Sequence, residues 1–201
     1  MNAARAPERV AIFGGTFDPI HNAHLAVAVE AADRFQLDRV LVIPNGNPPH
    51  KQGVERTDWL HRYRMVELAC HAAADARLTP SRLEEGRARS YSIHTIERVT
   101  AAYPGDAVFF LIGADAFAEI RTWYRWQDVL AAVEFIVVSR PGHAYDIPEG
   151  ARVLALETMA LDVSSSDIRA ELRQGKMPDA MPGPVKDYIV AAGLYGFRTG
   201  E

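Results

Sequence analysis

The chain has a single cysteine, Cys70, among its 201 residues, and this scarcity excludes several kinds of site. An internal disulfide, a cysteine-based zinc finger and a dithiol redox centre each need at least two cysteines. One cysteine agrees with a reducing compartment, so we expect a cytoplasmic protein. The fold needs no covalent or metal crosslink, because a chain of this length buries roughly 70% of the surface that its unfolded form exposes.

Long apolar runs are also missing. No segment approaches the ~18 consecutive apolar residues of a membrane-spanning helix. The first ten residues contain two arginines with no apolar stretch after them, which is unlike a secretory signal. We therefore expect no membrane partner.

An excess of positive charge is missing as well. Lys and Arg number 22 against 26 Asp and Glu, for a net charge of −4. Nucleic-acid-binding domains are usually basic, so we expect no nucleic-acid partner. A small phosphorylated ligand stays compatible with this charge, because a pocket on an acidic protein can be locally positive. The 48% hydrophobic and 24% charged residues are typical of a globular domain and exclude a disordered or collagen-like chain.

Short, wholly apolar segments alternate with segments of helical periodicity. Strands are predicted at 9–13, 39–44, 107–112 and 134–139, with weaker ones at 77–83 and 151–156, and helices at 22–35, 57–74, 92–103, 166–174 and 184–192. Strands that are apolar throughout are covered on both faces, as in a parallel sheet flanked by helices. The sequence thus predicts one α/β domain over residues 1–201, a doubly wound three-layer α/β/α sandwich, with C-terminal helices from about residue 164. Such sheets bind ligands at the carboxyl ends of their strands.

The segment after the first predicted strand carries the strongest pattern, G-G-T-F-D-P-I-H-N-A-H-L over residues 14–25. Gly14 and Gly15 allow a sharp turn and let a phosphate approach the backbone amides. The helix that follows offers free N–H groups to an anion. His21 and His24 lie on one face of that helix start, where a bound anion should favour their protonated forms. Two glycines alone would be consistent with an ordinary turn.

A second pattern, V-S-S-S-D-I-R over residues 163–169, opens a predicted helix near the C-terminus. A serine at a helix start caps free amides, and Arg169 one turn later can reach an anion held there with two parallel N–H groups. In isolation, the segment favours a simpler interpretation, an ordinary capped helix that carries a surface arginine.

Both patterns resemble signatures of the nucleotidylyltransferase superfamily. Residues 14–24 resemble G-G-x-F-D-P-x-H-x-G-H with Ala23 in place of a glycine, and residues 164–169 resemble S-S-T-x-I-R with Ser166 in place of threonine. The resemblance implies a Rossmann-like fold. It implies an ATP site made of Gly14, Gly15, Thr16, Phe17, His21, His24, Gly113, Asp115, Ser165, Ser166, Ile168 and Arg169.

Further segments resemble the bacterial nicotinate-mononucleotide adenylyltransferases in particular. They are P-N-G-N-P-P-H-K at 44–51, S-Y-S at 90–92, G-A-D at 113–115, T-W-Y-R-W at 122–126, R-P-G at 140–142 and G-L-Y at 193–195. This resemblance implies a mononucleotide site made of Asn45, Lys51, Ser92, Trp123, Tyr124 and Arg140. Ser92 would help a helix start receive the pyridine carboxylate, and Trp123 would stack on the ring. Without the resemblance, Lys51 is a solvated lysine and Trp123 fills the core. We interpret the G-L-Y segment as packing.

The resemblance implies adenylyl transfer from ATP to nicotinate mononucleotide, with His21, His24, Lys51 and Arg169 as the catalytic residues. The attacking phosphate is already ionised at neutral pH, so no general base or covalent intermediate is required. Mg²⁺ would bind as part of the ATP substrate and would have few protein ligands. We therefore expect no metal site made by protein side chains. Members of the family form monomers, dimers and larger assemblies, so the resemblance is compatible with a homo-oligomer. The alternatives are a transferase for another phosphate acceptor, such as phosphopantetheine, and a non-catalytic nucleotide-binding module.

Overall fold

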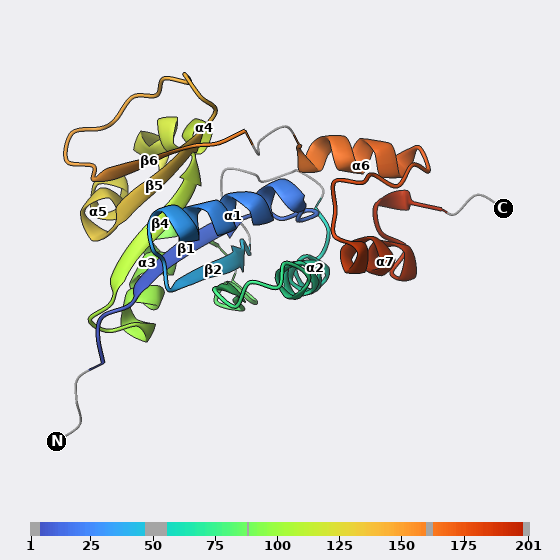
Figure 1. The fold of residues 1–201 in the computed structure, drawn as a ribbon, viewed down its shortest axis with the longest axis horizontal. Helices are drawn as coiled ribbons and strands as arrows, with labels where there is room; N and C mark the ends of the chain where they lie inside the picture. The colour runs from blue at the N-terminus through green and yellow to red at the C-terminus, as the bar shows by residue number, and fades with distance from the viewer. Residues whose placement is uncertain (1–4, 47–55, 88, 160–162, 199–201) are drawn as a thin grey trace.

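The computed structural model describes residues 5–46, 56–87, 89–159 and 163–198. Its centre is a six-stranded sheet in the order β3-β2-β1-β4-β5-β6, and every neighbouring pair is parallel (Figure 1). The strands are β1 (Arg9–Gly15), β2 (Arg39–Pro44), β3 (Leu78–Pro80), β4 (Ala107–Gly113), β5 (Glu134–Ser139) and β6 (Val153–Glu157). The strand order reverses between β1 and β4, which confirms the predicted doubly wound, Rossmann-like fold.

Helices cover both faces of this sheet, as the three-layer prediction requires. They are α1 (Asn22–Arg34), α2 (Trp59–Ala72), α3 (Ser92–Ala102), α4 (Ala114–Ala118), α5 (Trp126–Ala132), α6 (Ser165–Arg173) and α7 (Gly183–Ala191), with short 3₁₀ turns η2 (Ile120–Thr122) and η3 (Leu194–Gly196). The sequence did not predict α4 and α5. Both have fewer than eight residues, too few for a clear helical period. None of the helices in the described ranges is both long and apolar enough to span a membrane.

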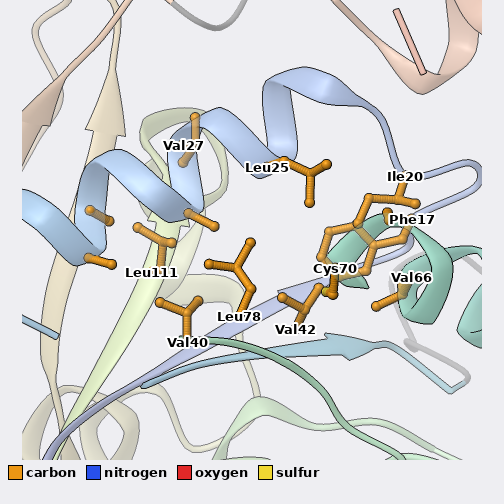
Figure 2. Close-up of a cluster of buried hydrophobic side chains, with 14 of the residues drawn as sticks. Phe17, Ile20, Leu25, Val27, Val40, Val42, Val66, Cys70, Leu78 and Leu111 are labelled. Carbon is orange, nitrogen blue, oxygen red and sulfur yellow. The ribbon is translucent and has the colours of Figure 1, made fainter. Parts of the chain in front are cut away.

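Two hydrophobic clusters lie on opposite faces of the sheet and explain why the strands are apolar throughout. Ala11 of β1 belongs to the cluster under α1, whereas its neighbours Val10 and Ile12 belong to the cluster under α3. Figure 2 shows the first cluster, with Leu25 of α1 above Val42 of β2. Burial of such a side chain is worth about 1.5–3 kcal/mol, so both clusters hold helices to the sheet.

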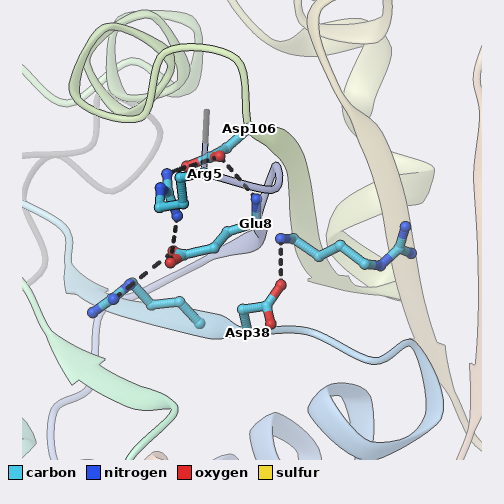
Figure 3. A network of polar contacts seen from close by, with 6 residues as sticks. Arg5, Glu8, Asp38 and Asp106 are labelled. Atoms are coloured by element: carbon cyan, nitrogen blue, oxygen red, sulfur yellow. Dashed lines mark hydrogen bonds and ion pairs between the residues drawn. The ribbon is translucent and has the colours of Figure 1, made fainter. Parts of the chain in front are cut away.

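Charged residues join the amino ends of the strands, at the edge of the sheet opposite the loop that follows β1 (Figure 3). The Asp106 carboxylate accepts from Arg5 Nη2 at 2.7 Å and from the main-chain N–H of Glu8 at 2.8 Å. The main-chain N–H of Arg9 donates to Asp38 Oδ2 at 2.8 Å. These contacts fix β1 between its two neighbours, and they lower the pKa of Asp106 through its hydrogen bonds to Glu8 and Arg5.

At the carboxyl edge, β1 stays paired with β2 through Gly15 but pairs with β4 only through Phe13. Gly14 and Gly15 therefore extend beyond the β1–β4 pairing. This is the topological switch point of the sheet, where α/β proteins bind their ligands.

Candidate functional site

A cavity of about 290 Å³ opens at the carboxyl ends of β1, β2 and β4. We call it the cleft. It brings together seven of the residues that the sequence assigned to a ligand site, namely Gly14, Gly15, Thr16, Asn45, Ser92, Gly113 and Trp123. Residues of both predicted subsites thus line one cavity, although they lie up to 109 positions apart in the chain.

Glycine is needed at position 15 because the chain approaches another group closely there, whereas position 14 leaves just enough room for a Cβ atom. A Cβ atom on Gly15 would lie 2.7 Å from the ring of Phe17, and one on Gly14 would lie 3.4 Å from Asn45 Oδ1. The Phe17 ring is buried in the hydrophobic cluster under α1, with the backbone in the left-handed region at φ 49°. The structure thus places Phe17 beneath the cleft, as a support for Gly15 and not as a lining side chain.

His21 and His24 form a stacked pair at the start of α1. Their ring centroids are 3.6 Å apart, and the main-chain N–H of His21 donates to Nδ1 of His24 at 3.2 Å. An Nδ1 that accepts a hydrogen bond carries no proton, so neutral His24 holds its proton on Nε2. Nδ1 of His21 is buried and has no hydrogen-bond partner among the described residues.

Burial keeps both imidazoles neutral in the free protein. It lowers the pKa of His21 to about 4. It lowers the pKa of His24 well below its usual value, with a smaller contribution from the charge of His21. Protonation of this pair therefore depends on an anion that compensates for burial, as the sequence prediction assumes for the bound state.

The second motif docks on the loop between β1 and α1. Ser164 caps α6, because its Oγ accepts from the main-chain N–H of Asp167 at 3.1 Å. Ser165 Oγ donates to the carbonyl of Pro19 at 2.9 Å. Arg169 Nη1 donates to the carbonyl of Asp18 at 2.6 Å, and its Nη2 donates to Ser166 Oγ at 3.3 Å. The two signatures are thus in direct contact.

Ile168, the remaining predicted residue of that motif, lies in the core at 1% exposure. Its side chain anchors α6 to the cluster under α1. Like Phe17, it supports the candidate ATP site from the hydrophobic cluster under α1.

Ten of the described residues predicted for the site do not line the cleft. Seven of them belong to the two signatures described above, namely Phe17, His21, His24, Ser165, Ser166, Ile168 and Arg169. The other three lie elsewhere. Asp115 projects into solvent from α4, with Nε2 of His143 at 3.8 Å. The ring of Tyr124 is half-exposed and packs against Tyr91, with centroids 4.6 Å apart. Arg140 follows β5 in an exposed position. Lys51, assigned to phosphate by resemblance, lies outside the described residues.

Trp123 does line the cleft, and its ring meets Phe110 of β4 edge-on with centroids 6.0 Å apart. Ser92 lines the same cavity and is the first residue of α3, where a helix has amides without intrahelical partners. The arrangement presents one aromatic ring and one helix start to a ligand.

Two buried charged residues of the site escaped sequence analysis. The guanidinium of Arg62, at 2% exposure, donates to the carbonyls of Thr16 at 2.8 Å, Thr57 at 3.0 Å and Gly46 at 3.4 Å. It thereby joins the loops after β1 and β2. Burial lowers its pKa, but an arginine stays protonated. Nothing in the sequence distinguishes it from Arg64, the other arginine of α2.

The second is Glu84, at 1% exposure, whose Oε1 accepts from Thr95 Oγ1 and from Arg98 Nη1, both at 2.8 Å. Thr95 lines the cleft, so this carboxylate supports the first turns of α3. Within the described ranges, no group of three or more His, Cys, Asp or Glu side chains is arranged to hold a metal ion.

Comparisons with known proteins agree with this geometry. Residues 12–171 match the cytidylyltransferase-like family model. A probable nicotinate-nucleotide adenylyltransferase from Solibacter usitatus is 57% identical over 93% of this chain and 99% of its own length. The nicotinate-nucleotide adenylyltransferase of Bacillus subtilis is 36% identical over 94% of this chain and 98% of its own length.

Among solved structures, the nicotinic acid mononucleotide adenylyltransferase of Plasmodium falciparum in complex with NaAD superposes with a TM-score of 0.79. The match covers 96% of this chain and 100% of that one at 19% identity, so it shows a shared fold. The identity and coverage of the bacterial relatives, together with the direct contact between the two signatures, lead to a single conclusion. The chain belongs to the nicotinate-nucleotide adenylyltransferase family of cytidylyltransferase-like proteins.

Proposed function

We propose that the chain transfers the adenylyl group of ATP to nicotinate mononucleotide, giving nicotinate adenine dinucleotide and pyrophosphate in NAD biosynthesis. One observation carries the assignment of residues. The two histidines of the first signature and Arg169 of the second meet on one loop, next to a cleft lined by Ser92 and Trp123. Phosphate-binding and ring-binding groups are then within reach of one dinucleotide.

The nucleophile in this reaction is the phosphate of the mononucleotide, which is ionised at neutral pH. Catalysis then consists of positioning and of stabilising charge as the pyrophosphate departs. His24 presents a Nε2–H donor, because its Nδ1 is occupied by the main-chain N–H of His21. Negative charge that develops on the phosphates favours uptake of a proton by the histidine pair and strengthens this contact.

Arg169 supplies permanent positive charge. Two of its nitrogens contact Asp18 and Ser166, and a guanidinium has five N–H donors, so donors remain for phosphate oxygens. Gly14 and Gly15 line the cleft without side chains, so phosphate oxygens can approach their main-chain atoms. Lys51, Asp115 and Arg140 are assigned to the substrates by resemblance alone.

On the mononucleotide side, the proposal assigns the pyridine carboxylate to Ser92 and the amides at the start of α3, and the pyridine ring to Trp123. Asn45 hydrogen-bonds through its main-chain N–H to the carbonyl of Gly15 at 2.8 Å, so it connects the two subsites. Tyr124, which packs on Tyr91 and does not line the cleft, is assigned to the mononucleotide by resemblance alone.

Mg²⁺ belongs to this proposal as part of the ATP substrate. The described residues provide no carboxylate cluster for it, and Mg²⁺ commonly keeps phosphate oxygens and water as ligands. Bound in this way, it would neutralise phosphate charge.

The test is an assay of the purified protein with ATP, Mg²⁺ and, in separate reactions, nicotinate mononucleotide, nicotinamide mononucleotide or phosphopantetheine. Pyrophosphate release and dinucleotide formation are measured together. We expect the highest kcat/KM with nicotinate mononucleotide. Preference for phosphopantetheine would establish the alternative acceptor, and absence of pyrophosphate with all three would leave only a nucleotide-binding module.

A further inference from the structure

The C-terminal turn η3 reaches the loop that carries the histidines through one side chain. The hydroxyl of Tyr195 donates to Asp18 Oδ1 at 2.7 Å, across 177 positions of sequence. The other carboxylate oxygen of Asp18 accepts from the main-chain N–H of Thr57 at 3.2 Å. Asp18 is 3% exposed and lies three residues before His21, so these contacts act on the loop at its centre.

We propose that Tyr195 is a positioning residue for adenylyl transfer, which acts through Asp18 to hold the His21–His24 pair and Arg169 in register. This inference rests on the proposed function. Asp18 connects Tyr195 to Arg169. Its carboxylate accepts a hydrogen bond from the Tyr195 hydroxyl, and its main-chain carbonyl accepts one from Arg169 Nη1. A shift of Asp18 therefore moves the histidine loop and the arginine relative to each other.

The backbone at Tyr195 supports a role beyond packing. Its φ of 59° lies in the left-handed region, between Gly193 at 61° and Gly196 at 71°. A non-glycine residue in this region is strained, and such residues concentrate at functional sites. Glycine would satisfy the same turn, so the tyrosine side chain is what the position adds. Tyr195 also packs against the core under α1, which makes the hydroxyl the atom to test.

The substitution Tyr195→Phe removes the hydroxyl and keeps the ring. Since misplacement of reacting groups by ~1 Å can cost up to a hundredfold in rate, we expect kcat to fall at least tenfold. The KM values for ATP and nicotinate mononucleotide should stay within about twofold of the wild-type values. The hydrogen bonds of Asp18 affect the alignment of the catalytic side chains more than the contacts that bind the substrates in the ground state. The matched control is Tyr188→Phe on α7, which removes a hydroxyl paired with His61 Nδ1 at 2.8 Å, away from Asp18. This control should keep wild-type kcat.

A double-mutant cycle with Asp18→Ala separates positioning from a general loss of stability. If Tyr195 acts through Asp18, Tyr195→Phe lowers kcat in the wild-type background and has little further effect in the Asp18→Ala background. Equal effects in both backgrounds, or wild-type kcat in Tyr195→Phe, would overturn the inference. A wild-type protein that forms no dinucleotide would instead refute the proposed function, so the two failures are distinct.

Discussion

The ring of Phe17 meets the imidazole of His24 edge-on, with centroids 5.0 Å apart and planes at 83°. Since His21 stacks on His24 as well, the imidazole is confined by two neighbouring rings. A side chain confined in this way keeps one orientation without help from substrate, which is what catalysis by preorganised donors requires.

The first prediction concerns this imidazole. We expect His24→Ala to lower kcat by on the order of 10²–10³, the cost of removing one donor to transition-state charge. Its Tm and circular dichroism should show an intact fold. Turnover near that of the wild type would remove His24 from the mechanism.

The pH dependence of stability follows from the lowered pKa values. Because folded His21 titrates near pH 4 and burial also lowers the pKa of His24, the unfolded chain binds more protons than the folded one between about pH 6.5 and 4. The contribution of the pair to stability is therefore present above about pH 6.5 and is lost as the pH falls through this window.

Urea unfolding at pH 7.5, 6.0 and 5.0 measures this effect. The control is the double variant His21→Gln/His24→Gln, which retains every carboxylate of the wild type. We expect the wild type to lose more free energy of unfolding than the double variant on acidification. Parallel losses would show that the histidines are not held neutral by burial.

Arg62 yields a prediction about stability. The substitution Arg62→Met removes the guanidinium that donates to the part-buried carbonyls of Thr16 and Thr57. Since a hydrogen bond from a charged group contributes about 1.5–3 kcal/mol, we expect the free energy of unfolding to fall by about 2–4 kcal/mol.

The matched control is Arg64→Met, two residues later on α2, whose guanidinium is half-exposed and pairs with Glu67. An exposed pair of this kind contributes at most about 1 kcal/mol. Similar losses for the two variants in urea unfolding would contradict a specific role for Arg62.

Trp123→Ala tests the assignment of the mononucleotide subsite. We expect the KM for nicotinate mononucleotide to rise roughly tenfold, since loss of stacking comes on top of loss of buried area. The KM for ATP should change little. If both KM values rose equally, Trp123 would act only as a packing partner of Phe110.

The sequence predicted secondary-structure elements correctly where a local pattern determines them. The apolar runs at 39–44 and 134–139 coincide with β2 and β5, because both faces of those strands are buried. The helix expected at 57–74 forms as α2, which Asp58 caps by accepting from the main-chain N–H of Leu60 at 2.9 Å. The strand expected at 77–83 is shorter, since β3 ends at Pro80, which lacks an N–H to continue the pairing.

The sequence could not predict features that depend on tertiary contacts. The T-W-Y-R-W segment resembles a binding motif as a unit, yet Trp123 lines the cleft while Tyr124 packs on Tyr91. We interpreted G-L-Y as packing, and nothing near Tyr195 in the sequence indicated its contact with Asp18. The contact between Tyr195 and Asp18 joins residues 177 positions apart, and such a contact leaves no local period in the sequence.

The hydrogen bond between Tyr195 and Asp18 also has a consequence for the order in which the protein is made. Translation delivers His21 and His24 first, and the side chains that hold their loop, Arg169 and Tyr195, follow more than 140 residues later. A nascent chain can therefore form β1 and α1 long before the loop between them acquires its contacts. Ribosome-bound intermediates that stop before residue 195 would carry both histidines without the geometry that aligns them.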